Sequence, residues 1–335
     1  MAELFARLPR MSMVLLFQLV DEMQDETRKS VEATTPVVLV HGFWHGSWCW
    51  SLVAEQLASR GVASVAVDLD GHGLKSRSPR SRWGRPFDAE AFAVEPSPVA
   101  GISASSAAAS LVEQVRRIGS GRPCLVVAHS MGGTVATAAA EQAPELFAEL
   151  MYVTAFAPVS GAPTAQYLRM PENAGEMVAS GLSADPASVG ALRYDTGDSD
   201  RRAVIRETFY NDVTDEVTAE AAISLLTTDA PAGVPSEPIT VTAERYGSIP
   251  HSYVVCTRDN AIRPTLQRLM IREIDAISAQ PTTVVEMDSS HSPFLSRPTA
   301  LADVIHVAHR AIHRHDRSRT AGARPGPGSH ERTAS

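Results

Sequence analysis

A serine between small residues lies where a short apolar run gives way to an alanine-rich segment. The run 124–128 has the length and valine content of a buried parallel strand, and the segment 134–140 favours a helix. A sharp turn between the two strains the backbone at Ser130, so small residues such as Ala128 and Gly132 fit best two positions away. The turn would present the hydroxyl as a nucleophile and aim the N–H of Met131 at an oxyanion. An ordinary tight turn with an incidental serine is the alternative.

A base and an acid for this serine follow at the ends of two later apolar runs. A serine hydroxyl needs a general base, and the base needs an orienting acid. Asp259 follows the run 253–257, and His291 follows the run 282–287. The carboxyl ends of parallel strands meet at one edge of a sheet, where ligands bind. The sequence therefore predicts a catalytic triad of Ser130, His291 and Asp259.

Other histidines and acids of the sequence are less well placed to act as the base or the acid for Ser130. His251 precedes its predicted strand and so belongs at the opposite edge of the sheet. Asp288, three residues before His291, is expected to shape that loop. The remaining histidines of the C-terminal region lie in or after a closing helix, away from any strand end: His306, His309, His313 and His315.

A glycine-containing loop, residues 41–46, follows the apolar run 36–40 near the start of the chain. Glycine lets the backbone approach a ligand closely, and the N–H of Phe43 is the predicted second oxyanion donor. We expect His41 and His45 to hold this loop by hydrogen bonds rather than to act in catalysis or bind a metal. The sequence has no Cys-x-x-Cys spacing, and neither a metal nor a cofactor is predicted.

Apolar runs alternate with helical segments along most of the chain, which predicts a mostly parallel α/β sheet flanked by helices. The pattern changes between residues 160 and 245, where short amphipathic pieces such as 203–210 and 218–226, the latter capped by Thr218, predict an inserted helical cap. The predicted organisation is an N-terminal extension (1–35), a core (36–159 and 246–313), the cap (160–245) and a disordered tail (314–335).

Composition limits the function classes. The 335 residues are 44% hydrophobic, enough for one α/β domain with an insertion, and the net charge of −8 argues against nucleic-acid and anionic-membrane partners. Three cysteines in apolar surroundings indicate reduced thiols and a cytoplasmic protein. The apolar run 13–20 is too short to span a bilayer and lacks a cleavage site. A small molecule is the expected partner, and a homodimer stays open.

The long connection 75–98 has no clear periodicity, and loops of this length are often functional. We expect it to border the substrate pocket and to contribute Trp83. Trp44 and Phe156, at the ends of two predicted strands, are the other predicted substrate-binding residues. An aromatic lining of this kind suits a small, mainly apolar substrate.

The blocks 41–50, 128–133, 253–259 and 288–293 resemble the α/β-hydrolase superfamily. More narrowly they resemble the branch that contains plant methylesterases, hydroxynitrile lyases and their bacterial relatives, over roughly residues 36–312. The resemblance implies the α/β-hydrolase fold and an enzyme. Lyases of this branch typically carry a threonine after the first loop histidine and a lysine after the catalytic histidine. Gly42 and Ser292 stand there in this chain, which favours ester hydrolysis over cyanohydrin cleavage.

The favoured hypothesis is a cofactor-independent serine hydrolase that cleaves a carboxylic ester of a small, mainly apolar molecule through an acyl-enzyme. A tailoring enzyme of a small-molecule pathway, performing a cyclisation, a decarboxylation or a C–C cleavage on the same fold, is the first alternative. A non-catalytic ligand-binding module is the second, and the complete triad argues against it.

Overall fold

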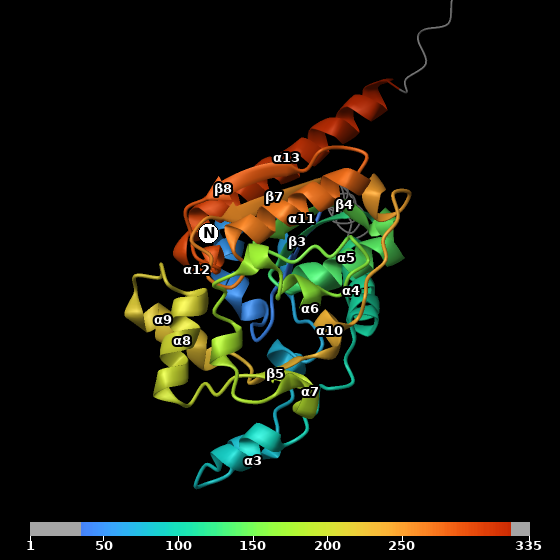
Figure 1. Cartoon of the computed structure of the whole chain (residues 1–335). Helices are drawn as coiled ribbons and strands as arrows, with labels where there is room; N and C mark the ends of the chain where they lie inside the picture. Colours follow the sequence, from blue (N-terminus) through green and yellow to red (C-terminus); the bar gives the residue numbers. More distant parts are fainter. Residues whose placement is uncertain (1–34, 323–335) are drawn as a thin grey trace, which may run out of the picture. The chain divides into compact units, whose positions relative to one another are not determined.

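Six parallel strands form the central sheet. The computed structural model describes residues 35–322 (Figure 1). The strands run in the order β2-β1-β3-β4-β7-β8, and all neighbours are parallel. Their bounds are β1 Val37–Val40, β2 Ser64–Val67, β3 Cys124–His129, β4 Phe147–Val153, β7 His251–Cys256 and β8 Thr283–Met287. The predicted parallel α/β sheet is confirmed.

The inner strands are apolar because both faces of the sheet are covered. All residues of β1, β3 and β7 are buried, whereas the edge strands β2 and β8 keep exposed positions. Successive residues of β1 serve different faces: Val38 and Val40 belong to one apolar cluster, and Val37 and Leu39 belong to the other. This alternation follows from the two-residue period of a strand.

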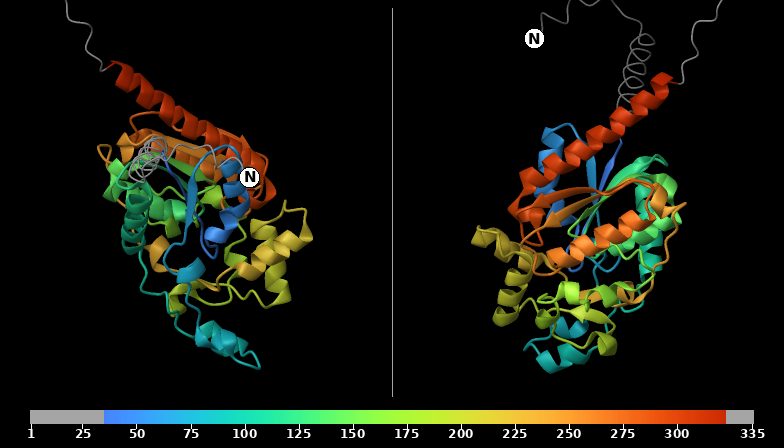
Figure 2. Two further views of the ribbon diagram at one scale, coloured as in Figure 1. Left: turned by 180° about the vertical axis from the view of Figure 1, so that it is seen from behind. Right: turned by 45° about the horizontal axis from the view of Figure 1, so that its top comes forward.

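Helices cover both faces of the sheet. One face carries α4 (Ala104–Gly119), α5 (Gly132–Gln142) and α11 (Pro264–Ile277). The opposite face carries α2 (Ser51–Ser59) and α13 (Pro298–Gly322), and Figure 2 shows α13 in red on the far side of the sheet from the green helices. Ser103 is the N-cap of α4, since its hydroxyl accepts the N–H of Ser106 at 3.3 Å.

The segment between β4 and β7 folds over the carboxyl ends of the strands and is called the cap here. Its helices are α6 Thr164–Tyr167, α7 Pro186–Val189, α8 Ser199–Phe209, α9 Glu216–Leu225 and α10 Gly233–Ser236. It also holds an antiparallel pair, β5 Ala191–Arg193 and β6 Asp229–Pro231, that the sequence did not predict. The prediction that Thr218 is the N-cap of a helix is wrong. Asp215 is the N-cap residue of α9, and the Thr218 hydroxyl donates to its carboxylate.

A buried ion pair joins the cap to the connection 75–98. Arg193 and Asp229 are both fully buried and share two hydrogen bonds of 2.8 and 2.7 Å. The guanidinium also donates to the carbonyl oxygens of Phe92, within α3 (Ala89–Val94), and of Glu95, the residue that follows this helix. The connection 75–98 is therefore ordered, and Figure 1 shows it extending outward from the cap side of the molecule.

The remaining short helices are α12 Pro293–Ser296, η2 Ser47–Trp50, η3 Gly73–Lys75, η4 Arg80–Trp83, η5 Pro144–Leu146, η6 Pro171–Asn173, η7 Ala179–Gly181 and η8 Tyr246–Ser248. Helix α13 runs to Gly322, so residues 314–322, expected in a disordered tail, are helical. The predicted extension, except its last residue, and the rest of the predicted tail lie outside the described residues. Across residues 35–322 no helix combines the length and hydrophobicity that crossing a membrane requires.

Candidate active site

Ser130 occupies the predicted turn between β3 and α5. Its φ of 53° is unusual for a residue other than glycine and is the strained conformation expected of a strand-to-helix turn. The Ser130 carbonyl oxygen accepts the N–H groups of Gly133 and Phe156, both at 3.0 Å, which hold the turn. A Cβ at Gly132 would lie 2.3 Å from the carbonyl oxygen of His41, so this position requires glycine.

The structure brings the three predicted triad residues together. His291 Nε2 lies 2.9 Å from Ser130 Oγ, and His291 Nδ1 lies 2.7 Å from Asp259 Oδ2. Asp259 and His291 are buried, at 0% and 1% exposure. A carboxylate can only accept a hydrogen bond, so Nδ1 of His291 carries the proton and Nε2 is free to accept the serine hydroxyl.

Backbone and side-chain donors fix the Asp259 carboxylate. Its Oδ1 accepts the N–H groups of Ala261 at 2.6 Å and Ile262 at 2.9 Å. Its Oδ2 also accepts the hydroxyl of Thr154, which follows β4 at a φ of 37°. Sequence reasoning missed Thr154. The signal was a polar residue directly after an apolar strand, the same signal that identified Asp259.

A second missed residue, His129, precedes the nucleophile and holds the His291 loop. Its Nε2 donates to the backbone carbonyl of His291 at 2.7 Å. Burial holds the pKa of His129 well below its usual range, so the ring stays neutral. The contact ties the loop that follows β8 to the end of β3, which fixes the base beside Ser130.

The histidines of the loop 41–46 hold its backbone, as expected. His41 Nδ1 donates to the Gly42 carbonyl at 2.7 Å, and its Nε2 accepts the N–H of Leu69 at 3.0 Å. His45 Nδ1 donates to the Phe43 carbonyl at 2.8 Å, and its Nε2 lies 2.8 Å from the hydroxyl of Tyr210. The Gly42 carbonyl and the Phe43 N–H belong to one planar peptide unit, so His41 also sets the direction of that N–H.

The predicted oxyanion donors lie beside the nucleophile. Phe43, Met131 and Ser130 line the same pocket. Within residues 35–322 neither the Phe43 N–H nor the Met131 N–H has a hydrogen-bond acceptor. A Cβ at Gly42 would lie 2.5 Å from Ser130 Cβ, so the loop backbone packs directly against the nucleophile. Both N–H groups are thus available to a ligand bound at Ser130.

The pocket at Ser130, called the inner pocket here, contains two of the three predicted substrate-binding residues. Trp44 and Phe156 line it, while Trp83 lies in η4 and is 64% exposed. The prediction for Trp83 is wrong because the connection 75–98 runs outward, and the cap supplies the lining instead. The inner pocket is lined by Phe43, Trp44, Ser130, Met131, Phe156, Leu168, Val178, Leu192, Phe209, Ala261 and Ile262.

Buried neutral histidines near the site predict a loss of stability in mild acid. Burial lowers the pKa of His41 and of His45 to about 3 and that of His72 to about 4. Below the unfolded value of 6.5 the unfolded chain binds protons that the folded chain does not, so stability falls as the pH drops from 6.5 toward these folded values. At pH 5.5 the three together cost up to about 4 kcal/mol relative to pH 7.5.

Urea unfolding at the two pH values measures this loss. The variant His72→Gln should show a loss smaller by about 1 kcal/mol, the contribution of one buried histidine that no longer titrates. Equal unfolding free energies at pH 7.5 and pH 5.5 would contradict the prediction.

The sequence profile of the Alpha/beta hydrolase family matches residues 37–304. The chain belongs to this family. It is therefore an enzyme of the α/β-hydrolase fold, as the resemblance implied, and esterases are among its relatives.

Two relatives and one solved structure illustrate the similarity. This α/β-hydrolase is 28% identical over 274 residues to "Methylesterase 9" of Arabidopsis thaliana, and the match covers 79% of this chain and 94% of the relative. It is 23% identical over 270 residues to "Norfluorocurarine synthase 1" of Strychnos sp, covering 79% and 91%. A pyrethroid hydrolase from Sphingobium faniae JZ-2 superposes with a TM-score of 0.62 at 20% identity, covering 83% and 98%. At that identity the last similarity shows the fold alone.

Proposed function

We propose that this α/β-hydrolase is a cofactor-independent serine hydrolase that cleaves a carboxylic ester of a small, mainly apolar molecule through an acyl-enzyme. The observation that carries the proposal is the continuous chain of hydrogen bonds from Asp259 through His291 to Ser130, with distances of 2.7 and 2.9 Å. The similarity to a methylesterase supports the reaction class.

Acylation begins when Ser130 Oγ attacks the ester carbonyl carbon. The serine proton passes to His291 Nε2, the nitrogen that faces it. The resulting imidazolium is stabilised by Asp259, whose own charge is held by the N–H groups of Ala261 and Ile262. The proton on Nε2 is then donated to the leaving alcohol, which departs as the acyl-enzyme forms.

The negative charge on the tetrahedral intermediate falls on the former carbonyl oxygen. The N–H groups of Phe43 and Met131 are the proposed donors to it, and one such donor is worth roughly 3 kcal/mol in other enzymes. Met131 is the N-cap of α5, so the positive end of that helix adds to the stabilisation. Water, deprotonated by His291, then attacks the acyl group and releases the acid.

The relative named as a synthase favours a second candidate, a tailoring reaction on the same fold. In that reaction His291 would act as a base without a covalent intermediate on Ser130. Turnover of a substrate that survives Ser130→Ala but is lost in His291→Ala would identify this second function. Cyanohydrin cleavage is disfavoured, because Gly42 and Ser292 stand where lyases of the branch carry threonine and lysine.

Covalent labelling tests the proposal directly. A fluorophosphonate reacts with a serine only when a neighbouring base activates it. Intact-mass spectrometry should show one adduct on the natural protein and none on Ser130→Ala. A panel of methyl, aryl and alkyl esters then follows. A folded protein that forms no adduct and turns over no ester would overturn the proposal.

A further inference from the structure

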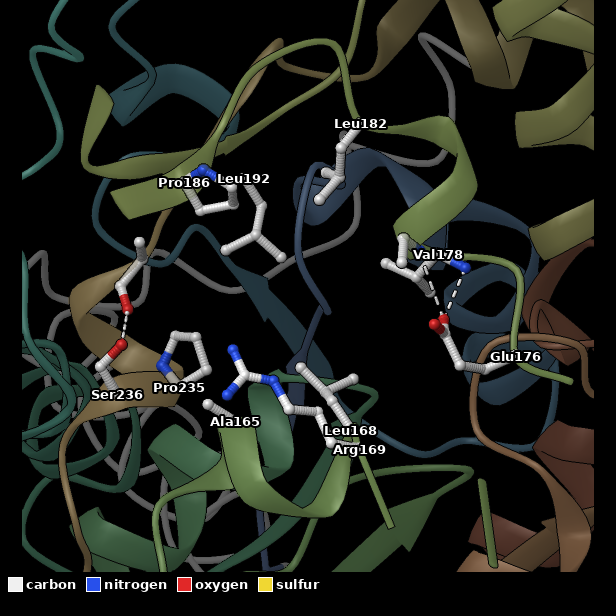
Figure 3. A pocket seen from close by; sticks show the side chains of 12 residues that line it. Ala165, Leu168, Arg169, Glu176, Val178, Leu182, Pro186, Leu192, Pro235 and Ser236 are labelled. Carbon is white, nitrogen blue, oxygen red and sulfur yellow. Dashed lines mark hydrogen bonds between the residues drawn. The ribbon is translucent and has the colours of Figure 1, made fainter. Parts of the chain in front are cut away.

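A second and larger space lies beside the inner pocket and is called the outer chamber here. It opens to solvent, and its empty volume, with the open part included, is about 700 Å³. The cap provides its walls, which are mostly alkyl side chains and proline rings, among them Leu182, Pro186 and Pro235 (Figure 3). A chamber of this character suits the apolar body of a ligand.

The outer chamber and the inner pocket share walls. Leu168, Val178 and Leu192 line both. The two spaces are therefore adjacent, separated by no more than these three side chains.

One cation faces the outer chamber without a protein partner. Figure 3 shows the guanidinium of Arg169 pointing into the chamber toward Pro235. Within residues 35–322 its side chain has neither a hydrogen-bond acceptor nor an ion-pair partner. The other arginines of residues 160–245 are all engaged: Arg193 with Asp229, Arg201 with the Ser180 carbonyl, Arg202 with Glu220, Arg206 with Glu216 and Arg245 with Glu141.

The carboxylate of Glu176, which also lines the outer chamber, does not pair with Arg169. Glu176 accepts the N–H of Val178 at 2.7 Å and that of Ala179 at 3.4 Å, at the start of η7. In Figure 3 the carboxylate points toward Val178, away from the side to which the guanidinium of Arg169 points. A planar guanidinium is the side chain best matched to a carboxylate, so the ligand itself is the natural partner for Arg169.

We propose that the substrate is an ester with an apolar body that ends in a carboxylate. Arg169 would bind that carboxylate, and the outer chamber would enclose the body. The inference rests on the proposed ester hydrolysis and narrows the substrate class. It makes Arg169 a specificity-determining residue, not a catalytic one.

Matched pairs of esters test the inference. One series contains the monomethyl esters of linear dicarboxylic acids, from butanedioate to dodecanedioate, each paired with its terminal carboxamide. A second series contains acetate esters of hydroxyalkanoic acids with their carboxamides, which places the charge on the alcohol side. At the best chain length the natural protein should prefer the carboxylate about fivefold in kcat/KM, the effect of one partly exposed charge pair.

Variants assign that preference to Arg169. Arg169→Gln should bring the ratio near one, Arg169→Lys should retain part of it, and Arg117→Gln, an exposed arginine of α4 outside the chamber, should leave it unchanged. Hydrolysis without a carboxylate preference in both series, or a preference that persists in Arg169→Gln, overturns the inference and leaves ester hydrolysis standing.

Binding gives an answer that does not depend on turnover. Isothermal titration calorimetry of Ser130→Ala with the same carboxylate and carboxamide esters should show the preference, and adding Arg169→Gln should remove it. Equal affinities for the two members of each pair would overturn the inference even if no ester were hydrolysed.

Discussion

Replacing Ser130 by alanine is expected to lower kcat for ester hydrolysis on the order of a millionfold, the loss seen when other serine hydrolases lose their nucleophile. The substitution deletes only Oγ, whose hydrogen bond is to His291 Nε2 at 2.9 Å. Alanine has the same Cβ and tolerates the φ of 53° no worse than serine does. The fold should therefore survive, with a change in the free energy of unfolding of about 1 kcal/mol or less.

Steady-state kinetics and thermal unfolding measure the two halves of this prediction. Ser59→Ala is the matched control: this exposed serine of α2 donates to the Gln56 carbonyl far along the chain from the site, and its kcat should equal that of the natural protein. A Ser130→Ala protein that keeps a tenth of the natural kcat would show that Ser130 is not the nucleophile.

The sheet could be predicted from the sequence because parallel strands buried on both faces are continuous apolar runs. Strands β3 and β7 are examples in which every residue is buried. The pair of β5 and β6 could not be predicted in the same way. Each has three residues, and their pairing joins segments almost forty residues apart, with Leu192 opposite Ala230. Such short strands exist through tertiary contacts, not through local pattern.

The triad could be predicted because each member lies shortly after the carboxyl end of a strand, so topology alone brings the three to one edge of the sheet. The supporting contacts could not, since they depend on which loops meet. The hydroxyl of Thr154 reaches Asp259, and the ring of His129 reaches the carbonyl of His291, across 105 and 162 positions of the chain. The prediction that Trp83 lines the pocket failed because an aromatic residue in a long connection does not show in which direction the connection runs.

The outer chamber also lay beyond sequence reasoning. Its walls come from several separate turns of the cap, such as those holding Leu168, Pro186 and Pro235. Arginines are frequent in this segment, and the sequence does not show which one lacks a partner. Only the packing separates Arg169 from Arg193, which is fully buried against Asp229.

Replacing Asp259 by asparagine is expected to lower kcat about ten-thousandfold, the loss known for the corresponding change in another serine hydrolase. Oδ1 accepts two backbone N–H groups, from Ala261 and Ile262, so the asparagine oxygen must occupy that position. The amide nitrogen then faces His291 Nδ1 in place of the carboxylate oxygen that lies 2.7 Å away. An NH₂ group donates, so Nδ1 must accept and the imidazole proton moves to Nε2, where it blocks removal of the Ser130 proton.

Asp288→Asn is the matched control for this effect. Asp288 lies three residues before His291, is 77% exposed at its side chain, and pairs at 3.1 Å with Arg258. Such an exposed pair contributes little, so kcat should change less than about twofold. Thermal unfolding separates a tautomer effect from a packing defect, because Asp259→Asn should lose rate while its thermal unfolding stays close to that of the natural protein. Equal losses in the two variants would mean that the orienting acid is not Asp259.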